Sequence, residues 1–305
     1  MSLLVVGSVA FDAIETPFGK TDKIVGGAAS YISLAASYFT QGTNLVAVVG
    51  EDFPQNFIVH LNKHGVNTEG LQVKEGEKSF FWSGKYHTDM NSRDTLVTEL
   101  NVLGNFDPIV PDSYQNCEYL MLGNLTPKVQ QTVIERLTKR PKLIVMDTMN
   151  FWMEIALDDL KQTLKMVDVL TINDEEARQL SGEYSLVKAA AKIQEMGPKY
   201  LIIKKGENGA LLFHGKEIFF APALPLEEVF DPTGAGDTFA GGFIGYLAKT
   251  GDISFDNMKN AIIYGSAMAS FCVEKFGTER IKNLSSDELK ERVNEFVNLS
   301  HFEII

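Results

Sequence analysis

The chain has 305 residues, of which 45% are hydrophobic and 22% charged, values typical of a soluble globular protein with a sizeable core. It carries 28 Lys and Arg against 40 Asp and Glu, a formal charge of −12 that argues against non-specific nucleic-acid binding. Two cysteines make no disulfide framework, and no signal-peptide pattern or membrane-spanning run of about 20 apolar residues is found, so we expect a cytoplasmic protein without membrane contact.

Short apolar, β-branched runs alternate with helix-like segments along the chain. The runs are continuous rather than alternating with polar residues, which indicates strands covered on both faces. The expected strands lie at 3–7, 45–50, 119–124, 142–147, 169–173 and 200–206. The expected helices lie at 27–39, 54–65, 127–140, 185–197 and 285–297. Strands alternating with helices predict an α/β fold with a central, mostly parallel sheet.

Residues 71–104 interrupt this alternation. Two strand-like pieces, SFFWSGKYHT and TLVTEL, are separated by turn residues and are expected to form hairpins outside the main sheet. The polar stretch 12–25 is expected to join them. No internal repeat or low-complexity linker is present, so we predict a single domain over residues 1–305 that carries a small β insertion.

The stretch DPTGAGDTFAGGF, residues 231–243, is rich in glycine and leads into an apolar repeat of helical spacing. Gly234, Ala235 and Gly236 therefore fall at a helix N-terminus, where free backbone N–H groups bind anions. The glycine spacing fits neither the dinucleotide-binding pattern nor the Walker A loop, which needs a lysine where Gly242 stands.

Asp237 lies in the first turn of this expected helix. Because a carboxylate repels a polyphosphate, its presence here needs another purpose. A base that removes a proton from an attacking hydroxyl would use this position well. From the residues alone, a glycine-rich helix start with Asp237 as a simple capping residue is the alternative.

The same stretch closely resembles the C-terminal signature of the ribokinase-like (PfkB) family of carbohydrate and nucleoside kinases. The resemblance implies a ribokinase-like three-layer sandwich with a small β lid, and ATP and Mg²⁺ as cofactors. It also implies that Gly234, Ala235 and Gly236 form an anion hole for the transferred phosphoryl group. Asp237 would then be the base that activates the acceptor hydroxyl.

The resemblance continues near the N-terminus. VVGSVAFD (5–12) resembles the family's opening strand, so Asp12 is expected to bind substrate hydroxyls, with a turn or capping role as the alternative. GGAASY (26–31) resembles the Gly-Gly signature and places Gly26 and Gly27 beside the substrate. Tyr31 occupies the substrate-contacting position where the family usually has Asn, so ribose or fructose specificity is not implied. This variant is similar to plant inositol kinases of the family.

NDEEA, directly after an expected strand, fits the family's NxxE motif. Asn173 and Glu176 are therefore expected to organise Mg²⁺, largely through water. A helix N-cap followed by first-turn acids explains the same residues.

IIKKGENGALLF (202–213) resembles the family's turn that lines the nucleotide. Lys204 is expected to point towards the phosphates and Lys205 away from them, because side chains alternate along a strand. Gly206 and Gly209 would form the turn.

The segment 261–279 resembles the family's adenine-lining region, which places Tyr264 and Gly277 at the nucleotide. Asp231 and Thr233 fall in the segment that contributes to a monovalent-cation loop, so K⁺ activation is a further expectation. Thr233 can also donate a hydrogen bond to a phosphate.

The lid implied by the resemblance comprises residues about 12–25 and 71–104. Its closure would expel water from the site, and its outer surface can pair with a second copy, so a monomer and a lid-mediated homodimer both remain open. Phe81, Trp82 and Tyr86 either contact substrate or a second lid, or simply pack within this thin sheet.

The sequence thus predicts an ATP-dependent kinase that phosphorylates a hydroxyl of a small sugar or polyol. A nucleoside (adenosine-like) kinase is the alternative, with an apolar slot for the base near Phe80, Phe81 or Trp82, and an inositol kinase is another. The alternative outside the enzymes is a non-catalytic ligand sensor on a kinase fold.

Overall fold

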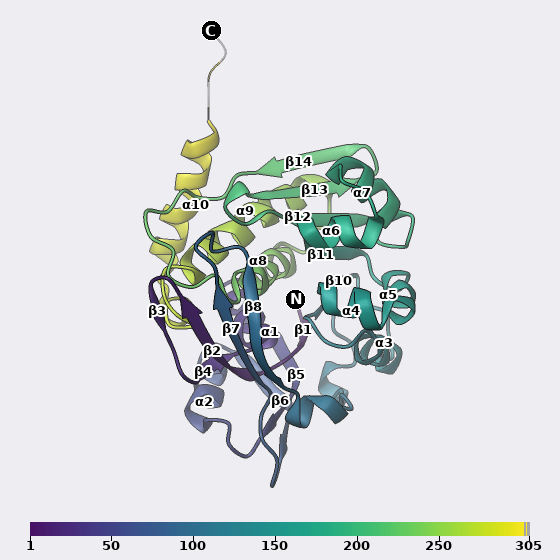
Figure 1. The fold of residues 1–305 in the computed structure, drawn as a ribbon. Helices are drawn as coiled ribbons and strands as arrows, with labels where there is room; N and C mark the ends of the chain where they lie inside the picture. Colours follow the sequence, from purple (N-terminus) through teal and green to yellow (C-terminus); the bar gives the residue numbers. More distant parts are fainter. Residues whose placement is uncertain (302, 304–305) are drawn as a thin grey trace.

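The computed structural model describes residues 1–301 and 303, and Figure 1 shows a central sheet flanked by helices on both faces. Its main-sheet strands are β1 (Leu3–Val6), β5 (Thr43–Gly50), β6 (Val66–Lys74), β9 (Tyr119–Leu122), β10 (Leu143–Asp147), β11 (Val169–Asn173), β12 (Tyr200–Lys204), β13 (Ala210–His214) and β14 (Glu217–Ala221). Within the described residues these strands are ordered β14-β13-β12-β11-β10-β9-β1-β5-β6. They are parallel from β12 to β6. Strands β13 and β14 add an antiparallel edge, so the predicted mostly parallel sheet is confirmed.

The helices form two groups on opposite faces of this sheet. One face is covered by α1 (Ala28–Ser37), α2 (Gln55–Lys63), α8 (Ala235–Thr250), α9 (Phe255–Cys272) and α10 (Ser286–Ser300). The other is covered by α3 (Pro127–Arg136), α4 (Asn150–Ile155), α5 (Leu157–Leu164), α6 (Asp174–Ser181) and α7 (Leu186–Gln194). Within the described residues, no helix has the length and apolar character needed to cross a bilayer.

Strand β1 shows why the apolar runs lie in the middle layer. Leu3 and Val5 belong to one apolar core, and Leu4 and Val6 belong to the other. All four are fully buried, because alternate side chains of a strand point to opposite faces and helices cover both. A continuous apolar run is the sequence pattern that this double burial requires.

A second, smaller sheet contains β2 (Ala10–Thr16), β3 (Gly19–Lys20), β4 (Ile24–Gly26), β7 (Phe81–Tyr86) and β8 (Arg93–Glu99). Its order is β3-β2-β7-β8, with β4 paired to β2. Strands β7 and β8 form an antiparallel hairpin, whereas β2 and β7 are parallel partners from distant parts of the chain. We call these five strands the small sheet.

The segment 71–104 is divided between the two sheets. Residues 71–74 are the end of β6 and pair with β5 in the main sheet, where a parallel partner satisfies their backbone. Residues 101–105 form a 3-10 turn, η1 (Asn101–Asn105), whose Val102 is buried in the core between the main sheet and helices α3 to α7. The part of this segment that belongs to the small sheet is therefore shorter than the sequence indicated.

Candidate active site

Helix α8 begins in the glycine-rich turn, as the apolar repeat indicated. Gly234 is its N-cap with φ 76°, a left-handed conformation that suits glycine. A Cβ atom at Gly234 would also lie only 2.5 Å from ring carbons of Tyr31, so the turn rests directly on that ring. The free N–H groups of the first turn and the positive end of the helix dipole make this turn, residues 234–236, suitable for an anion.

Asp237 follows in the first turn of α8 and is partly exposed. Its carboxylate accepts no hydrogen bond from the described residues. Burial raises the pKa of Asp237 to about 7, the nearby Asp147 carboxylate adds to the rise, and Lys204 and Arg93 oppose it. A carboxyl with a pKa near neutrality and a free oxygen can accept a proton from a hydroxyl.

Lys204 lies beneath the same turn. Its Nζ donates to Asp147 Oδ2 at 2.7 Å, and a Cβ atom at Gly236 would lie 3.0 Å from that Nζ. The expectation that Lys204 rather than Lys205 points into this region agrees with these contacts, and its role there stays a prediction. Asp147 was not singled out from the sequence, although a carboxylate at the carboxyl end of an expected parallel strand is a usable signal.

Asn173 and Glu176 form a capping box at the start of α6. Asn173 Oδ1 accepts from the Glu176 N–H at 2.7 Å, and Glu176 Oε2 accepts from the Asn173 N–H at 2.8 Å. The capping explanation therefore describes these residues. The capping hydrogen bonds leave Glu176 Oε1 free of a capping role. Asn173 is the strand partner of Lys204, so Asn173 and Glu176 both border the site. Burial first, and then Asp147, raise the pKa of Glu176 to about 7.

Asp12 enters the site from the small sheet. Its buried carboxylate occupies the space that a Cβ atom at Gly26 would fill, so this close approach requires glycine. Burial raises the pKa of Asp12 to about 7, opposed by the Gly27 N–H and supported by Asp231 and Asp237. The expected turn around Gly26 and Gly27 thus brings Asp12 and the end of β4 to the start of α1.

Tyr31 is buried beneath the glycine turn and does not line an open cleft. Its side chain is 1% exposed, its ring supports Gly234, and its hydroxyl has no hydrogen-bond partner within the described residues. Burial first, and then Asp12, raise the Tyr31 pKa above its usual value. The ring therefore has a structural role beneath the glycine turn, and a substrate contact through its hydroxyl stays a prediction.

Asp231 joins the glycine turn to the C-terminal loop 273–285. Its two carboxylate oxygens accept from the Thr233 N–H at 2.8 Å and from the Gly277 N–H at 2.9 Å. The Thr233 hydroxyl donates to Tyr86 Oη of the small sheet at 3.2 Å. These contacts fix Asp231, Thr233 and Gly277 together, while their expected roles towards K⁺, a phosphate and the nucleotide stay predictions.

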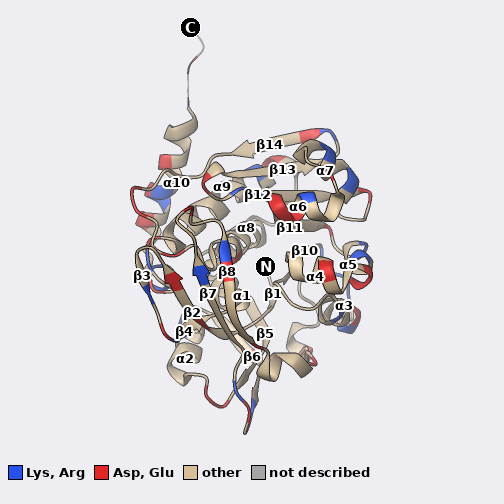
Figure 2. Ribbon diagram, viewed as in Figure 1, with Lys and Arg blue, Asp and Glu red and all other residues tan. Residues whose placement is uncertain are grey.

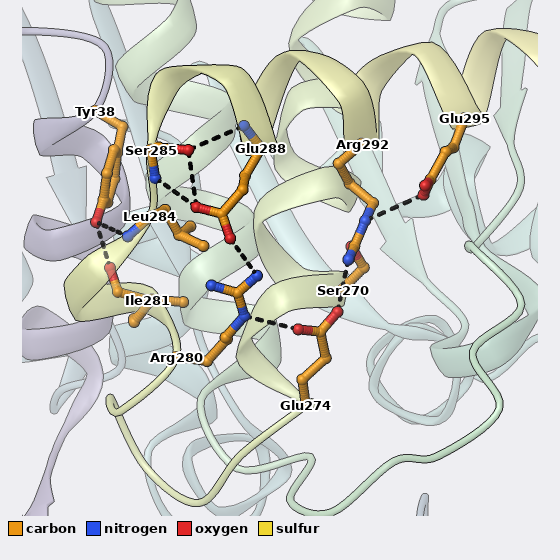
Figure 3. A network of polar contacts seen from close by, with 10 residues as sticks. All are labelled: Tyr38, Ser270, Glu274, Arg280, Ile281, Leu284, Ser285, Glu288, Arg292 and Glu295. Atoms are coloured by element: carbon orange, nitrogen blue, oxygen red, sulfur yellow. Dashed lines mark hydrogen bonds and ion pairs between the residues drawn. The ribbon is translucent and has the colours of Figure 1, made fainter.

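A polar network braces the loop that carries Gly277 (Figure 3). Arg280 donates to Glu274 and Glu288, and Arg292 donates to Glu274. The other members shown are Tyr38, Ser270, Ile281, Leu284, Ser285 and Glu295. Since Glu274 and Arg280 flank Gly277, the network holds this loop between α9 and α10.

Tyr264 packs against other aromatic rings. On α9 it stacks on Tyr246 at 4.2 Å between ring centroids and meets the edge of Phe39 at 5.6 Å. It is eight residues, or about 12 Å of helix, before Cys272, whose thiol contacts the Thr233 carbonyl. Tyr264 therefore packs among helices, because its face of α9 is turned towards α1 and α8, and its expected role at the nucleotide stays a prediction.

Gly206 and Gly209 do form the turn between β12 and β13, with the Lys205 N–H donating to the Gly209 carbonyl at 2.8 Å. A Cβ atom at Gly206 would collide with the side-chain amide of Asn91, which lies in the β7–β8 turn. The tip of the small sheet therefore reaches the turn that the sequence assigns to the nucleotide.

A family model described as "pfkB family carbohydrate kinase" matches residues 2–283. The chain belongs to this family. It is 31% identical over 250 residues to the cytidine kinase of Thermococcus kodakarensis, covering 80% of this chain and 87% of that protein. It is 26% identical over 291 residues to the nucleoside kinase of Methanothermobacter thermautotrophicus, covering 91% of each.

A solved nucleoside kinase of the ribokinase family has the same fold. The nucleoside kinase of Methanocaldococcus jannaschii superposes with a TM-score of 0.77 at 21% identity, covering 97% of this chain and 99% of that one. As a member of this family the chain is an ATP-dependent phosphotransferase, and the kinase predicted from the glycine-rich stretch is confirmed. The family match does not distinguish a sugar from a nucleoside acceptor.

The residues around the glycine turn fit Mg²⁺ together with ATP. The Glu176, Asp147 and Asp237 carboxylates and the Asn173 amide offer oxygen atoms, the ligands that Mg²⁺ prefers. In the described part of the chain, no three His, Cys, Asp or Glu side chains converge on one metal position. This arrangement suits an ion held mainly by water and phosphate oxygens.

Proposed function

We propose that this kinase phosphorylates a hydroxyl of a nucleoside. The observation that carries this proposal is the position of Trp82, which lies beside Asp12 on the face of the small sheet that is turned towards the glycine turn. An aromatic plane next to a carboxylate matches a planar base joined to a polyol. The sugar or polyol acceptor expected first from the sequence is the competing case.

The strand register supports this placement of Trp82. Asp12 and Trp82 are partners in the parallel pair β2–β7, and paired side chains lie on the same face of a sheet. Tyr86, four residues further along β7, shares that face, and its hydroxyl accepts from Thr233. Phe81 points the other way and packs against the core beneath α1 and α8, so it is not available to a substrate.

The Trp82 indole lies flat along the sheet. Its six-membered ring occupies the space over Gly84 that a Cβ atom would fill, and its Nε1 donates to Thr95 Oγ1 at 3.3 Å. The side chain is half-buried. Stacking of a base on such a plane contributes about 1–3 kcal/mol. The names of the relatives, a cytidine kinase and a nucleoside kinase, support the same acceptor class.

The proposed mechanism assigns each step to a residue of this chain. Asp12 accepts hydrogen bonds from the ribose hydroxyls and orients them. Asp237 takes the proton of the attacking hydroxyl, and the N–H groups of residues 234–236 bind the transferred phosphoryl oxygens. Bound Mg²⁺ would supply charge neutralisation on the phosphates, with Glu176 and Asn173 holding its water ligands. The small sheet acts as a lid that excludes water.

An acceptor screen tests this proposal. ADP release is measured with cytidine, uridine, adenosine and inosine and with ribose, fructose and myo-inositol, each with and without K⁺. We expect the highest kcat/KM for a nucleoside. A higher kcat/KM for a free sugar or inositol would contradict the proposal, and no ADP release with any acceptor would favour a ligand sensor.

Trp82→Ala tests the aromatic plane itself. Loss of stacking should raise the nucleoside KM about tenfold or more and leave turnover of free ribose unchanged. Trp82→Phe keeps an aromatic plane and serves as the matched control. An equal loss of kcat/KM for nucleoside and ribose in Trp82→Ala would show that Trp82 supports the lid and does not stack on a base.

A further inference from the structure

The turn between β7 and β8 lies over the phosphate end of the site. Asn91 in this turn touches Gly206, and Tyr86 at the end of β7 bonds to Thr233 beside the glycine turn. Figure 1 shows the two strands running towards α8 and β12. The tip of the small sheet is therefore anchored on both sides of the space that the phosphates would enter.

Arg93 begins β8 at this tip and shares a face with Tyr86. The two residues are cross-strand partners, so their side chains lie on the same side of the sheet, the side turned to the site. The Arg93 guanidinium is 6.0 Å from the centre of the Trp82 ring, which belongs to that same face. Arg93 is exposed and makes no ion pair with any described residue.

Lys85 provides the contrast on the same pair of strands. Figure 2 shows basic residues on both β7 and β8. Lys85 points to the opposite face, where its Nζ pairs with Glu15 at 2.6 Å. The small sheet thus carries two cations, Lys20 and Lys85, that pair with Glu15, and one, Arg93, that is unpaired within the described residues and lies on the face of the site.

The charge balance of the site needs such a cation. Asp12, Glu176, Asp237 and Asp147 bring carboxylates to one region, and the amine of Lys204 is already paired with Asp147. A γ-phosphoryl group that approaches Asp237 brings further negative charge. Arg93 is near enough to stabilise the charged forms of both Asp237 and Glu176, so its field reaches the point where that group must lie.

We propose that Arg93 binds the γ-phosphoryl group of ATP from the lid and stabilises the charge that develops on it during transfer. The guanidinium presents planar, paired N–H donors that match phosphate oxygens. Because the residue sits at the tip of the small sheet, this contact exists only when the lid is closed. The proposal rests on the kinase reaction and is independent of whether the acceptor is a nucleoside or a sugar.

Arg93 makes and breaks no covalent bond in this step. The acceptor oxygen forms a bond to the γ-phosphorus while its proton passes to Asp237. The bond from the γ-phosphorus to the bridging oxygen breaks, and ADP leaves with that electron pair. Arg93 donates to the equatorial oxygens throughout, and a donor of this kind typically changes turnover by about 10²–10³-fold.

Nucleotide binding without turnover gives the sharpest test. Calorimetry with Mg²⁺ compares a non-hydrolysable ATP analogue with ADP, for the parent protein and for Arg93→Gln. We expect the Kd of the analogue to rise about tenfold in the variant while the Kd of ADP changes less than about twofold, since ADP lacks the γ-phosphoryl group. Arg93→Lys should recover part of the loss because it keeps the charge.

Lys85→Gln is the control, because it removes a cation from the same strands on the other face and should leave both Kd values unchanged. Two results would overturn the proposal: an analogue Kd that does not change in Arg93→Gln, or equal weakening of the analogue and ADP. Turnover measured with the best acceptor from the screen should fall about a hundredfold in Arg93→Gln. The Kd comparison does not depend on the result of the acceptor screen. The nucleoside proposal and the Arg93 proposal can therefore be refuted independently of each other.

Discussion

Asp237→Asn should stabilise the ligand-free protein at pH 8 while it removes turnover. In the folded chain the pKa of Asp237 is raised from 3.8 to about 7, mainly by burial and then by Asp147. Between these two values the folded state binds a proton that the unfolded state has lost. Stability therefore falls as the pH rises from about 4 to about 7, and stays lower above that.

The magnitude follows from the size of the shift. A rise of about three pH units corresponds to at most about 4 kcal/mol at 1.36 kcal/mol per unit. An uncharged Asn of similar shape removes this penalty. The variant should thus gain up to about 4 kcal/mol in the free energy of unfolding at pH 8, and less than half of that gain at pH 5.

Urea unfolding at pH 5 and pH 8 in EDTA measures this difference, and an ADP-release assay measures turnover, which should fall by about 10²–10⁴. Glu135→Gln, an exposed residue of α3 without an ion pair in the described residues, is the control and should change neither quantity. If Asp237→Asn were no more stable than the parent protein at pH 8, the argument that burial of the charged Asp237 carboxylate destabilises the folded state would be refuted. Turnover close to that of the parent would refute its assignment as the base.

Three further changes test the supports of the site. Tyr31→Asn should destabilise the protein by about 3 kcal/mol or more in urea unfolding, because it empties the space under Gly234, whereas Tyr31→Phe removes only an unpaired hydroxyl and should cost less than about 1 kcal/mol. Gly234→Ala should lose both stability and affinity for a non-hydrolysable ATP analogue, since φ is positive there and the new methyl group meets the Tyr31 ring; an unchanged Kd for the analogue would speak against this. Arg280→Ala should speed amide hydrogen exchange over residues 273–285, while Glu295→Gln, which loses a single pair with Arg292, should not; identical exchange in both would show that the network does not hold the loop.

Local patterns in the sequence determined the middle layer and the glycine turn. Strands buried on both faces need continuous apolar residues, so runs such as residues 143–147 identify themselves without any knowledge of their neighbours. The anion-binding helix start follows in the same way, because the positive φ of Gly234 and the first-turn position of Asp237 are set by residues adjacent in the chain.

Tertiary structure decided which side chains meet at the site. Lys204 and Asp147 are 57 positions apart and join only because β10, β11 and β12 are neighbours in the sheet. The directions of Trp82 and Arg93 depend on the register of β7 against β2 and β8, and a shift of one residue would turn each of them to the other face. Such pairings join segments distant in the chain, so the local sequence pattern does not predict them.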